Sequence, residues 1–186
     1  MSQSKSHFVR VHDNMSASGD RTAVKSGFQI FRRRGDAANR PVRVEMRETS
    51  DDAKAGMRRL FDAGAEDGHD VRHITEIPGF TLTRAWFKNG FPIPLHSHEA
   101  DCLYYIAAGD IKLGTETLVP GDGFFVPGGS PYTFVPGENG VEILEFRHAT
   151  AHDIKIRTSR RDYWDRAVEK VTALREAWKT AVRPRG

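Results

Sequence analysis

The residues best suited to carry chemistry are His96 and His98, which a single serine separates in the segment HSHEAD. On a β-strand, side chains two positions apart share one face, and their Cα atoms lie about 6.6 Å apart. Two imidazoles on one face can converge on one metal ion at about 2.0–2.1 Å, the usual zinc–nitrogen distance. They can equally act as acid–base groups, because the unperturbed pKa of histidine is about 6.5. Ser97 would point away from both.

Two spaced patterns surround this pair. The first runs from Gly90 through five residues to His96-x-His98, then through three residues to Cys102 and six more to Gly109. The second runs from Gly121 through five residues to Pro127-x-Gly129 and two more to Tyr132. Together they resemble the two conserved motifs of the cupin superfamily, over roughly residues 75–150. The resemblance implies an all-β fold, the cupin jelly-roll barrel.

The resemblance also implies a metal site, because cupins commonly bind a metal ion through two histidines and a glutamate of the first motif and a histidine of the second. In this sequence the glutamate position is Cys102 and the last histidine position is Tyr132. Only His96 and His98 carry over directly. These two departures leave the ligand set open.

Three interpretations follow. In the first, a divalent metal ion (iron, nickel, manganese or zinc) is bound by His96 and His98 with a substituted ligand, which could be Cys102, Tyr132, Glu99 or His148. In the second, there is no metal, and His96, His98, Tyr104 and Tyr132 hydrogen-bond an organic ligand or transfer protons. In the third, the barrel is filled and these polar groups are structural. Strand alternation places Cys102 and Tyr104 on the inward face with Ile106.

We therefore expect a cupin that binds a small molecule. The first functional hypothesis is a metal-dependent enzyme of the oxygenase, lyase or isomerase class, a dioxygenase among the possibilities. It would use His96 and His98 as ligands, and Tyr104, Tyr132 and Cys102 as catalytic groups. The alternative is a metal-free, non-catalytic ligand-binding or sensor protein.

The elements that must position these residues are short. Apolar runs of four to eight residues alternate with Gly/Pro turns from about residue 75 to 150, which is typical of a sandwich or barrel. Residues 1–74 are expected to form an arm (1–26), two strands (27–34 and 41–49) and a helix over 49–64, with Thr49 and Asp52 as a capping box. Residues 151–186 contain an amphipathic helix, expected over 161–182.

Composition limits the remaining possibilities. The 186 residues include one cysteine, which excludes an internal disulfide and favours a reducing, cytoplasmic setting. No apolar run is long enough for a membrane helix, and the first residues lack the apolar segment of a secretory signal. Residues 1–50 and 151–186 are each basic, whereas the middle is acidic. We do not expect nucleic acid to bind, because no recognition motif accompanies the basic flanks. We expect a homodimer.

Overall fold

The computed structural model of the chain describes Ile30 and residues 42–185. The predicted arm and the strand expected over 27–34 lie outside these residues, except for Ile30. The elements, in chain order, are β1 (Glu45–Met46), α1 (Asp51–Asp62), η2 (Ala65–Gly68), β2 (His69–Ile77), β3 (Phe80–Phe87), β4 (His96–Ser97), β5 (Cys102–Leu113), β6 (Glu116–Leu118), β7 (Gly123–Val126), β8 (Val135–Arg147), β9 (Asp153–Ile156) and α2 (Arg161–Thr180). Among the described residues, no helix is long and apolar enough to cross a lipid bilayer.

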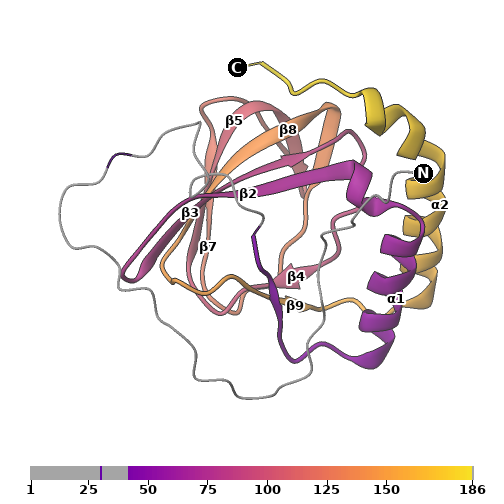
Figure 1. The fold of residues 1–186 in the computed structure, drawn as a ribbon, viewed down its shortest axis with the longest axis horizontal. Helices are drawn as coiled ribbons and strands as arrows, with labels where there is room; N and C mark the ends of the chain where they lie inside the picture. Colours follow the sequence, from indigo (N-terminus) through magenta and orange to yellow (C-terminus); the bar gives the residue numbers. More distant parts are fainter. Residues whose placement is uncertain (1–29, 31–41, 186) are drawn as a thin grey trace, which may run out of the picture.

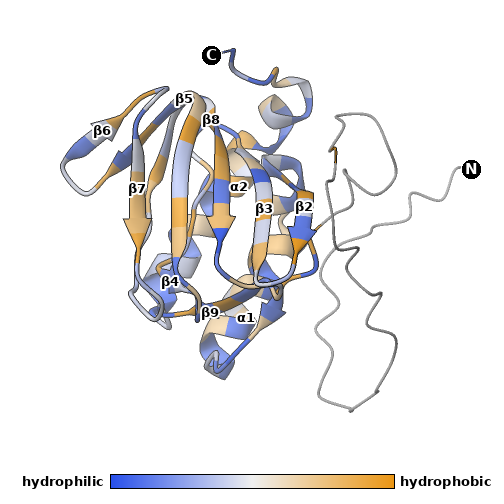
Figure 2. Cartoon of the chain, turned by 90° about the vertical axis from the view of Figure 1, so that its left-hand side faces the viewer, coloured by the Kyte–Doolittle hydropathy of each residue, from blue (hydrophilic) through white to orange (hydrophobic). Residues whose placement is uncertain are grey.

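A large antiparallel sheet forms most of the barrel. Its strand order is β2-β3-β8-β5-β6, and β7 pairs with β5 on the same sheet. A smaller sheet of order β1-β9-β4 faces it. Figure 2 shows β7, β5, β8, β3 and β2 side by side, with the helices behind them. The antiparallel barrel that the sequence predicted is therefore confirmed.

Side-chain alternation along β5 separates the interior of the barrel from its outer surface. Cys102, Tyr104 and Ile106 are buried, whereas Leu103 and Tyr105 between them are exposed. The inward set is the one that the sequence pattern predicted. The same alternation on β8 buries Ile143 together with two charged residues, Glu145 and Arg147.

Gly109 permits a close approach of two strands at a β-bulge in β5. Its φ is +72°, and a Cβ at this position would lie 2.0 Å from the carbonyl oxygen of Gly140 on β8. An L-residue would therefore meet both backbone strain and a backbone contact that no side-chain rotation relieves.

The close contact between the two strands at Gly109 predicts a large difference in stability between two glycine variants. Gly109→Ala should lower the free energy of unfolding by roughly 3 kcal/mol, because strain and the contact with Gly140 add. Gly114→Ala is the matched control, since Gly114 also has a positive φ, +61°, but nothing within 4 Å of its Cβ position. It should lose only about 1–2 kcal/mol. Urea unfolding of both variants measures the difference, and equal losses would contradict the close approach.

The two helices pack together at one side of the barrel (Figure 1). In α2, Trp164 and Trp178 are almost completely buried, and the Trp178 indole N–H donates to the carbonyl oxygen of Asn89 at 3.0 Å. Gly56 of α1 lies against Trp164, where a Cβ would come within 2.2 Å of the ring. The apolar stripe predicted for the tail helix thus packs within this chain, against α1, η2 and the loop after β3.

Two local expectations for the segment before α1 need correction. Within residues 42–49 the strand predicted over 41–49 is shorter than expected, because β1 spans only Glu45–Met46 and the backbone leaves the extended conformation at Glu48, where φ is +38°. The N-cap of α1 is Ser50, whose hydroxyl accepts from the Ala53 N–H, and Thr49 is not the cap. The Thr49 hydroxyl instead accepts from the backbone N–H of Ile156. This hydrogen bond fixes the start of α1 to β9.

Candidate functional site

A cavity of about 180 Å³ lies inside the barrel. Most of its wall is apolar and comes from β2, β3, the segment before β4, and β8. The segment 42–46 and helix α1 close one side with Val42, Val44, Met46, Met57, Leu60 and Phe61. The polar side chains that line it are His69, His96, His98, Tyr104, Tyr132, Glu145 and His152. Four of the residues named from the sequence, His96, His98, Tyr104 and Tyr132, therefore meet at one cavity.

Backbone pairing positions the first of these residues. His96 and Tyr132 form an isolated antiparallel bridge, with the His96 N–H donating to the Tyr132 carbonyl at 3.1 Å and the Tyr132 N–H donating back at 2.9 Å. Their ring centroids lie 4.3 Å apart. His98 follows two residues later, and its ring centroid is 5.1 Å from that of His96. The two motifs are thus joined across the barrel.

Tyr104, Tyr132 and His98 form a hydrogen-bonded chain, called here the tyrosine–histidine chain. The Tyr104 and Tyr132 hydroxyls are 2.5 Å apart, and the Tyr132 hydroxyl is 3.0 Å from His98 Nε2. His98 Nδ1 lies 2.5 Å from the Asp153 carbonyl oxygen, which can only accept, so Nδ1 carries the proton. Tyr132 therefore donates to His98 Nε2, and Tyr104 donates to Tyr132.

His96 has the same tautomer. Its Nδ1 donates to the Pro94 carbonyl oxygen at 2.8 Å, which leaves the lone pair on Nε2. Burial lowers the pKa of His96 to about 4 and also lowers the pKa of His98. Burial raises the pKa values of Tyr104 and Tyr132 well above the usual value. At neutral pH both imidazoles are neutral and both phenols are protonated.

This burial predicts a loss of stability in acid. The folded-state pKa of His96 is about 4 against 6.5 when exposed, so the unfolded chain binds more protons between these values. Stability should therefore fall as the pH drops from about 6.5 to about 4, by roughly 3 kcal/mol from this one residue. Urea unfolding at several pH values measures the slope, and His96→Gln should make it shallower. An equal slope in both proteins would contradict the burial of His96.

A buried network of charged side chains, Arg147, Glu145 and Asp153, lies next to His98. Arg147, which is 0% exposed, donates to Glu145 Oε1 at 2.5 Å and to Asp153 Oδ1 at 2.9 Å. Thr83 donates to the second Glu145 oxygen at 3.3 Å. Burial alone would raise the pKa of Glu145, but the Arg147 guanidinium holds it well below its usual value. The Asp153 carbonyl that accepts from His98 also accepts from Arg147 at 3.3 Å, which couples the network to the site.

Sequence reasoning missed this network and His152. A signal was present in the run VEILEFRH, because strand alternation places Glu145 and Arg147 on the face of Ile143. His152 lies in a loop that carries no such pattern. Burial lowers its pKa to about 3, and its Nε2 is 3.5 Å from an Arg147 nitrogen. Within residues 42–185, His152 Nδ1 has no hydrogen-bond partner, although the residue lines the cavity.

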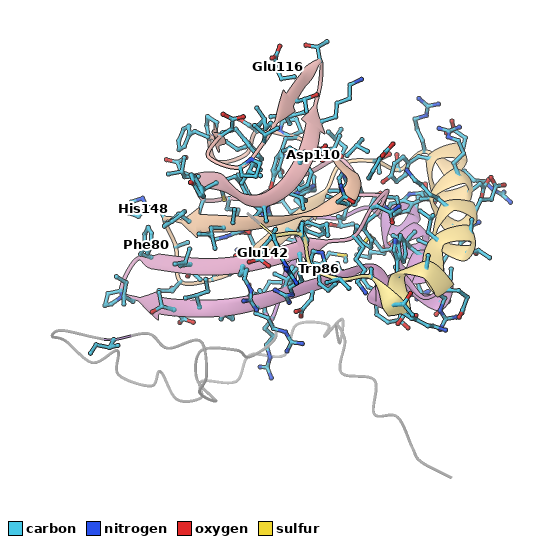
Figure 3. All side chains as sticks on the ribbon, turned by 90° about the horizontal axis from the view of Figure 1, so that it is seen from above. Phe80, Trp86, Asp110, Glu116, Glu142 and His148 are labelled. Atoms are coloured by element: carbon cyan, nitrogen blue, oxygen red, sulfur yellow. The ribbon has the colours of Figure 1, made fainter. Side chains whose placement is uncertain are left out.

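Two other predicted site residues are placed differently. Cys102 is buried but does not line the cavity, and its thiol donates to the Ala100 carbonyl oxygen at 3.4 Å. Burial raises the pKa of Cys102 to about 12, so it is a thiol rather than the thiolate that binds metals. His148 is exposed and lies at the end of the barrel far from the helices (Figure 3). His148 therefore does not line the cavity with His96 and His98, and the expectation that it is a third ligand is corrected.

These positions test whether the donor set fits a metal ion. Both Nε2 lone pairs are oriented as ligand tautomers, because both Nδ1 atoms donate to backbone carbonyls. The lone pair of His98, however, accepts from Tyr132, and Glu145 is bound by Arg147. In the part of the chain that the structure describes, no group of three or more His, Cys, Asp or Glu side chains could hold a metal. The side chains as arranged do not fit a divalent metal.

The comparisons with known proteins concern the fold. No family model matches the chain, and no curated protein matches it. KdgF from Halomonas sp. is 22% identical, aligned over 44% of this chain and 79% of that one, with a TM-score of 0.41. An RmlC-like cupin from Shewanella frigidimarina is 20% identical, aligned over 46% of this chain and 78% of that one, with a TM-score of 0.41. The polyketide cyclase RemF from Streptomyces resistomycificus is 20% identical, aligned over 57% of this chain and 82% of that one, with a TM-score of 0.47. With all three scores below 0.5, the fold assignment rests on this chain's own strand order and motif spacing.

Proposed function

We propose that this chain, whose strand order and motif spacing are those of a cupin barrel, binds a small organic molecule inside the barrel and carries out acid–base chemistry on it. The observation that carries the proposal is the tyrosine–histidine chain at the wall of an apolar cavity. It provides protonated phenols beside neutral imidazoles, which are the donor and acceptor that proton transfer needs. Among the oxygenase, lyase and isomerase classes, lyase and isomerase reactions can proceed by proton transfer between such phenols and imidazoles, without an oxygen-activating centre.

His96 is the proposed general base. Its Nε2 carries a lone pair at neutral pH, because Nδ1 is the protonated nitrogen and the ring is neutral. When this nitrogen takes a proton from the ligand, the resulting imidazolium is stabilised by the charge of Glu145, which favours the protonated form. The negative charge left on a ligand oxygen would be stabilised by a tyrosine hydroxyl that turns from its partner in the tyrosine–histidine chain to donate to the ligand, Tyr104 from Tyr132 or Tyr132 from His98. The proton returns from His96 to another ligand atom, which completes an isomerisation.

Proton exchange tests this proposal without knowledge of the natural reaction. The full chain in D2O with a chelator is incubated with small enolisable compounds (cyclohexanone, acetophenone and pyruvate), and deuterium incorporation is followed by NMR. We expect at least one compound to exchange faster with the protein than in buffer alone. Binding without exchange would instead favour the non-catalytic ligand-binding alternative. Exchange that depends wholly on added metal would contradict the metal-free chemistry.

A metal-dependent enzyme remains the second candidate. It is favoured by the ligand tautomers of His96 and His98, whose Nδ1 atoms both donate to backbone carbonyls. It would require Tyr132 to release His98. If bound at these imidazoles, a divalent ion would supply Lewis-acid or oxygen-activating chemistry.

Metal content distinguishes the two candidates. We expect untagged protein to contain less than one equivalent of iron, nickel, manganese or zinc, because the arranged donor set supplies fewer than three side-chain ligands. The double variant His96→Ala/His98→Ala is the control and should have the same content. One equivalent of metal in the wild type that is lost in the double variant would establish the second candidate.

Two further expectations stay predictions. A homodimer is expected from the sequence, but the stripe of α2 that was a candidate surface is buried within the chain, with Trp164 and Trp178 at 1% and 0% exposure. Light scattering at micromolar concentration would give the mass. The cytoplasmic setting is expected from the single cysteine, Cys102.

A further inference from the structure

We infer that the ligand of this cavity is an uncharged molecule about the size of one substituted ring, with an oxygen that accepts a hydrogen bond. The inference rests on the proposed function, which it deepens by naming the ligand class. Three independent features carry it: the size of the cavity, the charges at its wall, and an unpartnered donor.

The volume of the cavity limits the size of the ligand. The cavity measures about 180 Å³. Pockets for drug-sized molecules begin at roughly 300 Å³. The segment 42–46 and helix α1 line one side of it with Val44, Met46 and Phe61, so a ligand that extends to this side would contact these apolar side chains. A single ring with a short substituent therefore suits the space, whereas a fused two-ring system does not.

Charge excludes organic acids. Among the described residues that line the cavity, Glu145 is the only acidic one, and none is a lysine or an arginine. His98 Nε2 accepts from the Tyr132 hydroxyl, so this imidazole supplies no positive charge either. Behind the wall, two carboxylates (Glu145 and Asp153) share one guanidinium, Arg147, which leaves a net negative charge. A ligand carboxylate would lose its hydration without gaining a cation.

Charge also disfavours a cationic ligand. The Glu145 carboxylate already accepts from Arg147 at 2.5 Å and from Thr83 at 3.3 Å. The negative charge of Glu145 is therefore already balanced by Arg147. An ammonium group of a ligand would have to compete with this guanidinium for the carboxylate. A neutral ligand avoids both costs.

The unpartnered donor is His152. Its Nε2 faces an Arg147 nitrogen at 3.5 Å, so Nε2 is the acceptor and Nδ1 carries the proton. His152 lines the cavity, its pKa is lowered to about 3 by burial, and Nδ1 has no hydrogen-bond partner among residues 42–185. A buried donor without a partner is costly, and a carbonyl or hydroxyl oxygen of the ligand would satisfy it.

Binding of a matched probe series to the full chain tests the inference. The probes are benzyl alcohol, benzoate, benzylamine (cationic at pH 7.5) and 2-naphthalenemethanol, measured by NMR titration at pH 7.5 with chelator. We expect benzyl alcohol to bind at least tenfold more tightly than each of the others. Equal or tighter binding by benzoate, benzylamine or the naphthyl compound would overturn the inference, as would no binding by benzyl alcohol.

Variants identify the groups responsible. His152→Phe removes the donor and should weaken benzyl alcohol about tenfold while leaving toluene unchanged. Tyr105→Phe is the control, because this tyrosine is exposed on the outer face of β5. Glu145→Gln removes the negative charge and should improve benzoate binding several-fold, whereas no improvement would contradict the charge argument.

The outcomes also separate this inference from the proposed function. Tight binding of benzyl alcohol without deuterium exchange in any ketone would support the ligand class and contradict the acid–base chemistry. Exchange in pyruvate but not in the neutral ketones would support the chemistry and overturn the ligand class.

Discussion

Replacing Arg147 by Met should lower the free energy of unfolding by about 3–5 kcal/mol, the largest loss we expect from any single change in the barrel. The side chain is 0% exposed and donates to Glu145 and Asp153 at 2.5 and 2.9 Å. Methionine fills a similar space but leaves two buried carboxylates without their cation. The unpaired charges, rather than lost packing, produce the destabilisation.

A double variant tests that cause. Glu145→Gln/Arg147→Met removes one of the two carboxylates, so it should recover part of the stability lost in Arg147→Met alone. The surface control is Arg160→Met, whose side chain is 75% exposed and pairs with Asp162 on the same loop-to-helix boundary. It should unfold like the wild type. Urea unfolding of the four proteins gives all these values, and a loss of less than about 1 kcal/mol in Arg147→Met would contradict a buried guanidinium.

The second large effect is expected in catalysis. His96→Gln should lower the rate of deuterium exchange into a bound ketone by about 10²–10⁴-fold, because an amide cannot take up the proton that Nε2 accepts. Ligand affinity should change much less, since the cavity wall keeps its shape. Exchange rates and NMR titrations on the same samples measure both quantities.

The pH profile separates a base from a structural residue. Because the pKa of His96 is about 4, exchange by the wild type should be independent of pH between about 6 and 8. Tyr132→Phe should slow exchange too, whereas Tyr105→Phe, the same change at an exposed position, should not. Unchanged exchange in His96→Gln would falsify the assignment of the base.

The sequence allowed most of the barrel to be predicted, because its strands follow local rules. The alternation CLYYIA placed Cys102 and Tyr104 on the inward face of β5, as observed. The apolar stripe from Trp164 to Val182 predicted a tail helix over 161–182, and α2 spans Arg161–Thr180. Such patterns depend on side-chain periodicity within one segment, which is readable without the rest of the chain.

The predictions that failed depended on contacts between distant segments. Thr49 looked like a helix cap, but its hydroxyl accepts from Ile156, more than a hundred residues away, and Ser50 takes the cap. His148 looked like a third imidazole at the end of a strand, but it is exposed. The imidazole that lines the cavity from the segment after β8 is His152 instead.

The sequence by itself thus determined the barrel, its inward faces and the convergence of His96, His98, Tyr104 and Tyr132, because motif spacing and strand period fix which residues share a face. Only the tertiary structure decided their chemical state. Whether His98 offers a lone pair to a metal or accepts from Tyr132 depends on the Asp153 carbonyl and the Tyr132 hydroxyl. Whether Cys102 is a thiolate depends on its burial, which raises its pKa to about 12. Protonation and hydrogen bonding are set by the solvent-excluded surroundings that distant segments build together, and no local pattern encodes them.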